Sequence, residues 1–114
     1  MSIIKIEGNK NEIINELTDL ANEFVNSADK DIGYTAVIQP NSNDMPRPMV
    51  LANEIRDRVL NICEKYKNGN NINRMDVWCI MTTYDLATDM ITFSYNTVNT
   101  ISQIIIILDN IREN

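Results

Sequence analysis

The chain has 114 residues, with 16 acidic side chains, 10 basic side chains and no histidine, so its net charge is −6. This length fits one domain, which we place over residues 1–114. The lack of histidine excludes His-dependent acid–base catalysis, Ser-His-Asp triads and His-ligated zinc sites. The acidity argues against direct binding of nucleic acid, because contacts to phosphate need clustered Lys and Arg.

The first residues lack the pattern of a targeting segment. Residues 2–7 alternate weakly between apolar and polar side chains, which predicts a short strand or an ordered lead-in. No basic stretch followed by a long apolar stretch is present, and the longest apolar run, 104–108, is far shorter than the roughly 20 residues that span a bilayer. We therefore expect a cytoplasmic protein without a membrane partner.

Residues 11–27 have the pattern of an amphipathic helix. The apolar positions fill one arc of about 140° on a helical wheel. They are Ile13, Ile14, Leu17, Leu20, Ala21, Phe24, Val25 and Ala28. Asn9 is placed to cap this helix, and Glu12 follows three residues later, as in a capping box.

A strand, a loop and a second helix are expected next. Residues 32–39 are β-branched and aromatic without a helical period, which predicts a strand. All three prolines fall within 40–48, which predicts a loop. Residues 49–67 repeat apolar side chains at helical spacing, and Asn68 and Gly69 supply the stop.

Residues 75–84 and 90–96 are expected to pair as a β-hairpin around a loop at 85–89. The first segment is apolar on both faces of an extended chain, which is typical of a central strand and places Trp78 in the core. The second segment alternates apolar with polar residues, which predicts a strand with one solvated face.

The last segment, 100–110, fits two structures. Its four consecutive isoleucines favour a strand. Its apolar positions also fit one face of a helix that Asn99 or Thr100 would cap. We favour the helix, in which Ile106 falls on the polar side, and leave the strand open.

These elements give the order (β)αβαββα. The predicted fold class is α+β, with a small antiparallel sheet of three to four strands and about three helices packed on it.

The sequence offers little for catalysis. Cys63 and Cys79 lie in apolar segments without a histidine to activate them, so we interpret both as reduced structural thiols. The three glycines are too scattered for a phosphate-binding loop. Asp85 and Asp89 lack further cation ligands nearby in sequence, so a polar turn is the simpler interpretation. We expect no catalytic residue, no metal and no cofactor.

The main functional signal is a line of carboxylates on the first predicted helix, which we call the acidic row. It consists of Glu12, Glu16, Asp19 and Glu23. These residues fall within about 60° on the wheel, and like charges four residues apart slightly destabilise a helix. No lysine or arginine interrupts 11–28. We predict that the row binds a basic protein, and a plain solvated face is the alternative.

The proline-rich loop is a second candidate surface. Asp44, Met45 and Arg47 lie in it, and the prolines lower the cost of ordering the loop on a partner. A simple connector between two elements is the alternative.

In size, acidity and lack of catalytic motifs, the chain resembles anti-defence proteins of phages and mobile elements and toxin-neutralising immunity proteins. This resemblance implies a small, acidic, non-enzymatic inhibitor or interaction module that acts on a basic protein partner, with a homodimer left open. The alternative is a small-molecule or nucleotide-binding domain with a pocket between sheet and helices, also open to dimer formation. An enzyme that uses carboxylates in an unfamiliar way is the third hypothesis.

Overall fold

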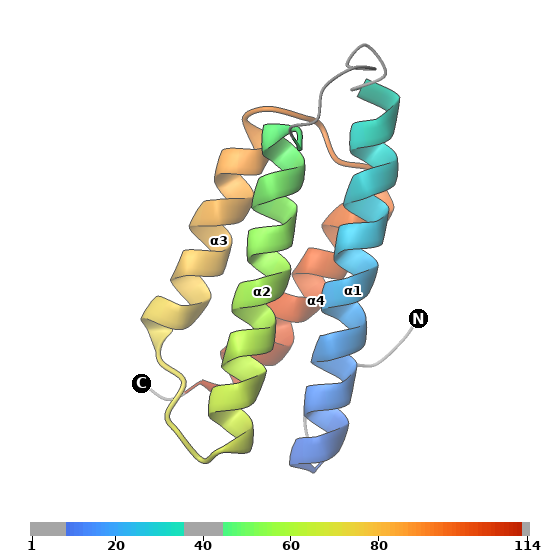
Figure 1. Cartoon of the computed structure of the whole chain (residues 1–114). Helices are drawn as coiled ribbons and strands as arrows, with labels where there is room; N and C mark the ends of the chain where they lie inside the picture. Colours follow the sequence, from blue (N-terminus) through green and yellow to red (C-terminus); the bar gives the residue numbers. More distant parts are fainter. Residues whose placement is uncertain (1–8, 36–44, 113–114) are drawn as a thin grey trace.

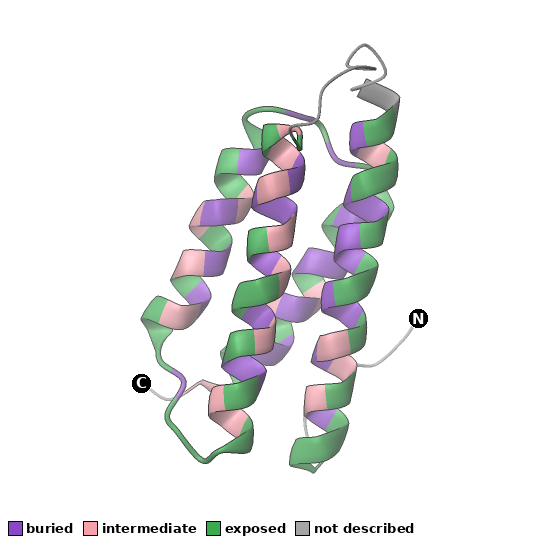
Figure 2. Cartoon of the chain, viewed as in Figure 1, coloured by how far each residue is buried: buried purple, intermediate pink, exposed green. Residues whose placement is uncertain are grey.

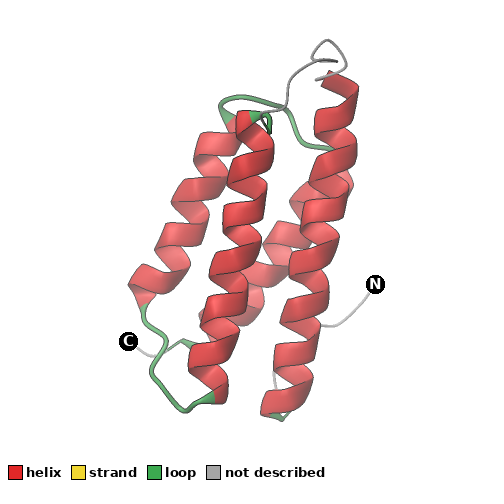
Figure 3. Ribbon diagram, viewed as in Figure 1, coloured by secondary structure: helices red, strands yellow, loops and turns green. Residues whose placement is uncertain are grey.

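The computed structural model describes residues 9–35 and 45–112, apart from the side chains of residues 34 and 35. These residues form four helices: α1 (Lys10–Thr35), α2 (Arg47–Lys67), α3 (Arg74–Thr88) and α4 (Tyr95–Ile111). Consecutive helices run in opposite directions, which makes an up-down-up-down bundle (Figure 1). The described residues contain no strand (Figure 3), so the predicted α+β fold with an antiparallel sheet is wrong.

Helix α1 is confirmed, and it is longer than predicted. The Asn9 side chain accepts a hydrogen bond from the Glu12 N–H at 2.9 Å, so the predicted cap is present. At the other end the helix continues through Ile32, whose side chain is buried four residues after buried Ala28. The predicted strand at 32–39 is therefore wrong over 32–35, because burial on the helical stripe outweighs β-propensity. Residues 36–39, like 2–7 and 40–44, lie outside the described residues.

Helix α2 is also confirmed, and it begins two residues earlier than predicted. It ends as the sequence indicates. Gly69 adopts a φ of +77°, a left-handed conformation that side chains disfavour. The Gly69 N–H donates to the Tyr66 carbonyl at 3.2 Å and the Asn70 N–H donates to the Lys65 carbonyl at 2.9 Å, which together form a Schellman motif.

Helix α3 replaces the first strand of the predicted hairpin. The Asn73 side chain accepts from the Asp76 N–H at 3.1 Å, and the Asp76 carboxylate accepts from the Asn73 N–H at 3.0 Å. This capping box starts a helix, and buried Val77, Ile80 and Ala87 then recur at helical spacing. The apolar residues that we assigned to two faces of a strand therefore form two stripes on a helix. One stripe is buried in the core and the other is exposed.

The prediction of a second hairpin strand is also wrong. Residues 91–94 connect α3 to α4 and have no partner strand among the described residues, and residues 95 and 96 belong to α4. The alternation in this connection is nevertheless meaningful, since Ile91 and Phe93 are buried and their neighbours are exposed. Helix α4 follows and confirms the favoured helix over 100–110. Ile106 is exposed on it, as the helical wheel predicts.

The core runs along the inward sides of all four helices (Figure 2). An aromatic group forms part of this core, in which Tyr84 of α3 stacks on Phe93 with ring centroids 5.7 Å apart. Phe24 of α1 is fully buried and meets both rings edge-on at 6.2 Å. Edge-on and stacked arrangements are the favourable ones for aromatic pairs. This group therefore ties α1 to α3 and to the connection before α4.

A polar contact, the Asp31 cluster of Ser27, Asp31, Asn96 and Thr97, joins α1 to α4. The Thr97 hydroxyl donates to the Asp31 carboxylate at 2.6 Å, and the Ser94 N–H donates to the same oxygen at 2.9 Å. The hydroxyl oxygens of Ser27 and Thr97 lie 2.6 Å apart, and the Asn96 amide donates to Ser27 at 2.9 Å. A carboxylate at the N-terminus of α4 is favourable, because the helix dipole is positive there.

We expect Phe24→Ala to lower the free energy of unfolding by about 3–5 kcal/mol, because it removes a fully buried ring that both other aromatics contact. The measurement is denaturant unfolding followed by far-UV circular dichroism. Leu86→Ala is the control, since Leu86 is 52% exposed and its loss is expected to change stability by less than about 0.5 kcal/mol. Equal effects of the two variants would contradict this packing.

Candidate functional site: an acidic row and an apolar groove

Helix α1 presents the acidic row toward solvent, and Glu23 at the end of the row contacts α4. Glu12, Asp19 and Glu23 are exposed, and Glu16 is half-buried. Two of the carboxylates are held by neighbours: Glu12 accepts from the Asn9 amide at 3.0 Å, and Glu23 accepts from the Thr100 hydroxyl of α4 at 3.2 Å. None of the four joins an ion pair within the described part of the chain.

Charge is distributed unevenly over the bundle. Helix α1 contains six carboxylates and two lysines, whereas α2 contains three carboxylates and five basic side chains. Ion pairs neutralise three of the cations on α2: Arg56 with Asp57, Arg58 with Glu54, and Lys65 with Asp76. Helix α4, beside α1, contains one carboxylate and no basic residue. The α1–α4 side is therefore the negative side of the molecule.

The predicted secondary surface is only partly described. Asp44 lies outside the described residues. Met45 is exposed, and its sulfur accepts a hydrogen bond from the Asn53 amide at 3.2 Å. Arg47 is exposed, but it is the first residue of α2 and not part of a loop. The structure brings neither residue to the acidic row, because they begin α2 and the row lies on the α4 side of α1.

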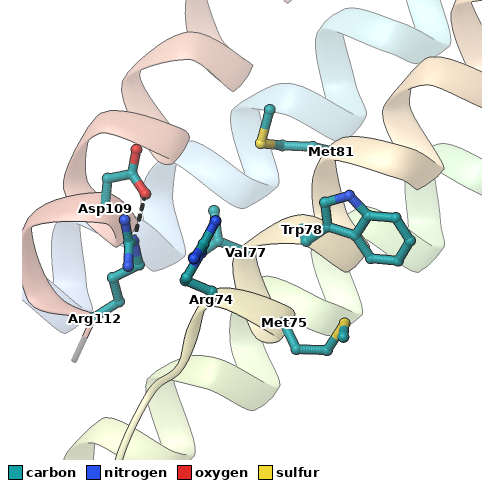
Figure 4. A pocket seen from close by; sticks show the side chains of 7 residues that line it. All are labelled: Arg74, Met75, Val77, Trp78, Met81, Asp109 and Arg112. Carbon is teal, nitrogen blue, oxygen red and sulfur yellow. Dashed lines mark hydrogen bonds and ion pairs between the residues drawn. The ribbon is translucent and has the colours of Figure 1, made fainter. Parts of the chain in front are cut away.

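An apolar groove lies between α3 and α4, the adjacent helices that contact each other least. Its first hollow, of about 420 Å³, lies at the start of α3 and the end of α4 (Figure 4). The lining side chains are Arg74, Met75, Val77, Trp78, Met81, Asp109 and Arg112. Met81 points toward α4, whereas Trp78 points away from it (Figure 4). The prediction that Trp78 is a core residue is wrong, since 57% of it is exposed.

A second hollow, of about 430 Å³, continues the groove toward the end of α3. Its lining is Met81, Tyr84, Asp85, Ile101, Ser102, Ile105 and Ile106. Met81 lines both hollows and separates them. Burial, and secondarily the charge of Asp85, raises the pKa of the Tyr84 hydroxyl, so this group stays protonated at neutral pH.

The groove was not predicted, although its signal is present in the sequence. Arg74, Trp78, Met81 and Asp85 follow one another at intervals of four, three and four residues. This is the spacing of one face of a helix, and only the assignment of a strand hid it.

Groups that bear catalytic chemistry are not gathered into a site. Within the described residues, no three His, Cys, Asp or Glu side chains lie close enough together to hold a metal ion. Asp85 lies in the last turn of α3, and Asp89 follows that helix as its C-terminal cap. Both cysteines are free; Cys63 is buried and Cys79 is half-buried. No helix among the described residues has both the length and the apolarity to cross a bilayer.

Comparison with protein-family models, curated proteins and solved structures gives no match to this chain. What the fold and surface define is therefore a class: a small acidic bundle of four helices with one acidic row and one apolar groove.

Cys63 supplies a pH-dependent prediction. Burial raises the pKa of its thiol from 9.0 to about 11. The folded protein then holds this proton more tightly than the unfolded chain, so the stability gained is complete below about pH 9 and is lost as the pH rises toward 11. Between about pH 8 and pH 11 we expect the free energy of unfolding to fall by about 2–3 kcal/mol more in the parent than in Cys63→Ala.

The measurement is denaturant unfolding across this pH range. Cys79→Ala is the matched control and is expected to fall with pH as the parent does. The same pH dependence in the parent and in Cys63→Ala would mean that the Cys63 thiol is not buried in solution.

Proposed function

We propose that this chain is a small, acidic, non-enzymatic binding protein that recognises a basic protein partner through the acidic row. The observation that carries the proposal is the row itself: four carboxylates along about 16 Å of one helix, none of them in an ion pair with another described residue. Exposed charge of one sign raises the rate at which an oppositely charged partner arrives and orients it.

Two further features favour a binding surface over a merely solvated face. The pairs Glu12/Glu16 and Asp19/Glu23 place like charges four residues apart, which slightly weakens the helix. In addition, Asn9 and Thr100 hold two of the carboxylates in place, so less side-chain freedom is lost when a partner binds.

Within this proposal, the action of the protein is inhibition or neutralisation of its partner. This part rests on the resemblance to anti-defence and immunity proteins in size, acidity and lack of catalytic motifs. A small rigid bundle suits this action, because it can cover a basic site without changing its own backbone.

A small-ligand site is the alternative function, and the two hollows of the groove favour it. They are apolar with a few polar groups at the edges, as ligand sites usually are. The groove contains no glycine-rich phosphate loop, so a small apolar molecule fits it better than a nucleotide.

The acidic row is tested by replacing its four carboxylates with amides, as Glu12→Gln, Glu16→Gln, Asp19→Asn and Glu23→Gln in one variant. The probe is a fluorescently labelled synthetic helical peptide rich in lysine and arginine, and the measurement is fluorescence anisotropy. At low salt we expect about a tenfold loss of affinity, because the row supplies most of the attraction. The difference should shrink at about 150 mM salt, where exposed charges are screened beyond about 8 Å.

The matched control carries the same change in net charge elsewhere, as amides at Asp29, Asp57, Glu64 and Asp89. We expect this control to lose less than about threefold in affinity, because the affinity should depend on where the carboxylates lie and not on the net charge of the protein. The row variant should also be slightly more stable than the parent, since the like-charge pairs are relieved. Equal affinities of the row variant and the control would contradict the proposal.

A further inference from the structure

The exposed side of α3 carries a stripe of four residues that the bundle does not use. Arg74, Trp78, Met81 and Asp85 follow at intervals of four, three and four residues, which is the spacing of the contact seam in paired helices. Trp78 is 57% exposed and Met81 is 47% exposed, although large apolar side chains are normally covered. The stripe has a cation at one end and a carboxylate at the other.

This stripe is complementary to itself when reversed. We propose that a second copy of this chain packs its α3 antiparallel against the stripe, around a two-fold axis that passes between Trp78 and Met81. The intervals of four, three and four read the same from either end, so the register is fixed. Arg74 then meets the partner's Asp85, Trp78 meets the partner's Met81, and the axis repeats both contacts in reverse, as a two-fold interface requires.

The two charges at the ends are explained by such a partner and not by the isolated helix. Arg74 is the first residue of α3 and Asp85 lies in its last turn. The helix dipole favours the opposite arrangement, an anion at the beginning and a cation at the end. Neither side chain makes an ion pair within the described part of the chain. Each charge therefore interacts unfavourably with the dipole of its own helix. In an antiparallel pair of α3 helices, each charge lies beside the opposite charge of the second copy.

The shape of the groove agrees with this register. Trp78 projects from α3 away from α4, and the second hollow lies on the far side of Met81 from it. Reversal about the axis brings the partner's Trp78 against Met81, at the mouth of this hollow. Tyr84 and Ile105 form part of its lining, so the incoming indole would meet apolar side chains. A projecting aromatic ring and an apolar hollow are thus both present on one face, as self-association needs.

The size of the interface predicts a weak dimer. A 15-residue helix is about 22 Å long, and two adjacent helices present a face roughly 20 Å wide. This gives roughly 450 Å² on each copy, which is at the low end for specific interfaces. None of the four acidic-row residues lines either hollow between α3 and α4, so the acidic row stays outside this interface. The proposal therefore does not depend on the function proposed above.

Trp78 is the only tryptophan in the chain, so its fluorescence reports on this interface directly. We expect sedimentation equilibrium to show a monomer–dimer equilibrium, and the tryptophan emission of the parent to shift to shorter wavelength as the concentration rises through the same range. Met81→Ala should weaken the dimer by about tenfold or more, because Met81 lies at the centre of the interface. Leu86→Ala, which removes an exposed side chain outside the groove, should leave it unchanged.

Charge reversal tests the register. Arg74→Asp alone and Asp85→Arg alone should each weaken the dimer by about tenfold, because each places like charges together at both ends. The double variant, Arg74→Asp with Asp85→Arg, should return to within about threefold of the parent, since attraction is restored with the signs exchanged. Lys30→Asp is the charge-matched control on α1 and should have no effect. All these changes are at exposed positions, and far-UV circular dichroism of each variant is the check that it is folded.

Three outcomes would overturn the proposal. The first is a parent that stays monomeric at concentrations approaching millimolar. The second is a dimer that the single charge reversals do not weaken or that the double variant does not restore, because a different surface would then form it. The third is a monomer whose tryptophan emission shifts when it binds the apolar dye 1-anilinonaphthalene-8-sulfonate, which would assign the groove to a small ligand.

Discussion

The architecture depends on one carboxylate. Asp31, near the end of α1, accepts hydrogen bonds from the backbone and a side chain at the beginning of α4, and it fixes where the last helix starts. The first turn of α4 is thus held to α1. The end of α4 lies near the start of α3, where Asp109 and Arg112 line a hollow together with Arg74. Contact between α3 and α4 is correspondingly sparse, and the groove is the space that this placement leaves open.

The charges of the bundle are segregated by helix, which gives its surfaces different characters. Three cations of α2 are neutralised in ion pairs, two by carboxylates of α2 and one by Asp76 of α3. On α1 the carboxylates of the acidic row have no such partners in the described structure, and α4 beside it adds uncharged polar groups. The α3–α4 groove is mainly apolar. A dimer through α3 would leave two acidic rows available, so one assembly could engage two copies of a basic partner.

The sequence predicts what local patterns determine. Asn9 caps α1 and Gly69 ends α2, as the sequence indicates. Both signals can be recognised in a short stretch of sequence, because a capping side chain and a terminating glycine act over only a few residues. The same reasoning correctly favoured a helix over 100–110 despite four consecutive isoleucines, because the apolar positions kept a helical period. The acidic row was also readable as one side of a helix.

The errors in the predicted fold arise where two local signals disagree. β-Branched and aromatic residues at 75–84 and 90–96 suggested a hairpin, but the capping box between Asn73 and Asp76 starts a helix there. The placement of Trp78 in the core follows from treating 75–84 as a central strand that is apolar on both faces, and the same assignment hides the groove. No pattern within a short window could show the contact between Asp31 and Thr97, which are 66 residues apart.

That separation also orders the assembly of the bundle. The connections from α2 to α3 and from α3 to α4 span only a few residues, so pairing these neighbours closes short loops at low entropic cost. The hydrogen bond between Glu23 and Thr100 joins residues that are 77 apart, so contact between α1 and α4 closes a much longer loop at a higher entropic cost. Chain topology therefore favours docking of α4 on α1 after the pairing of neighbouring helices, and we expect a chain that has not completed this step to expose the apolar side of α4.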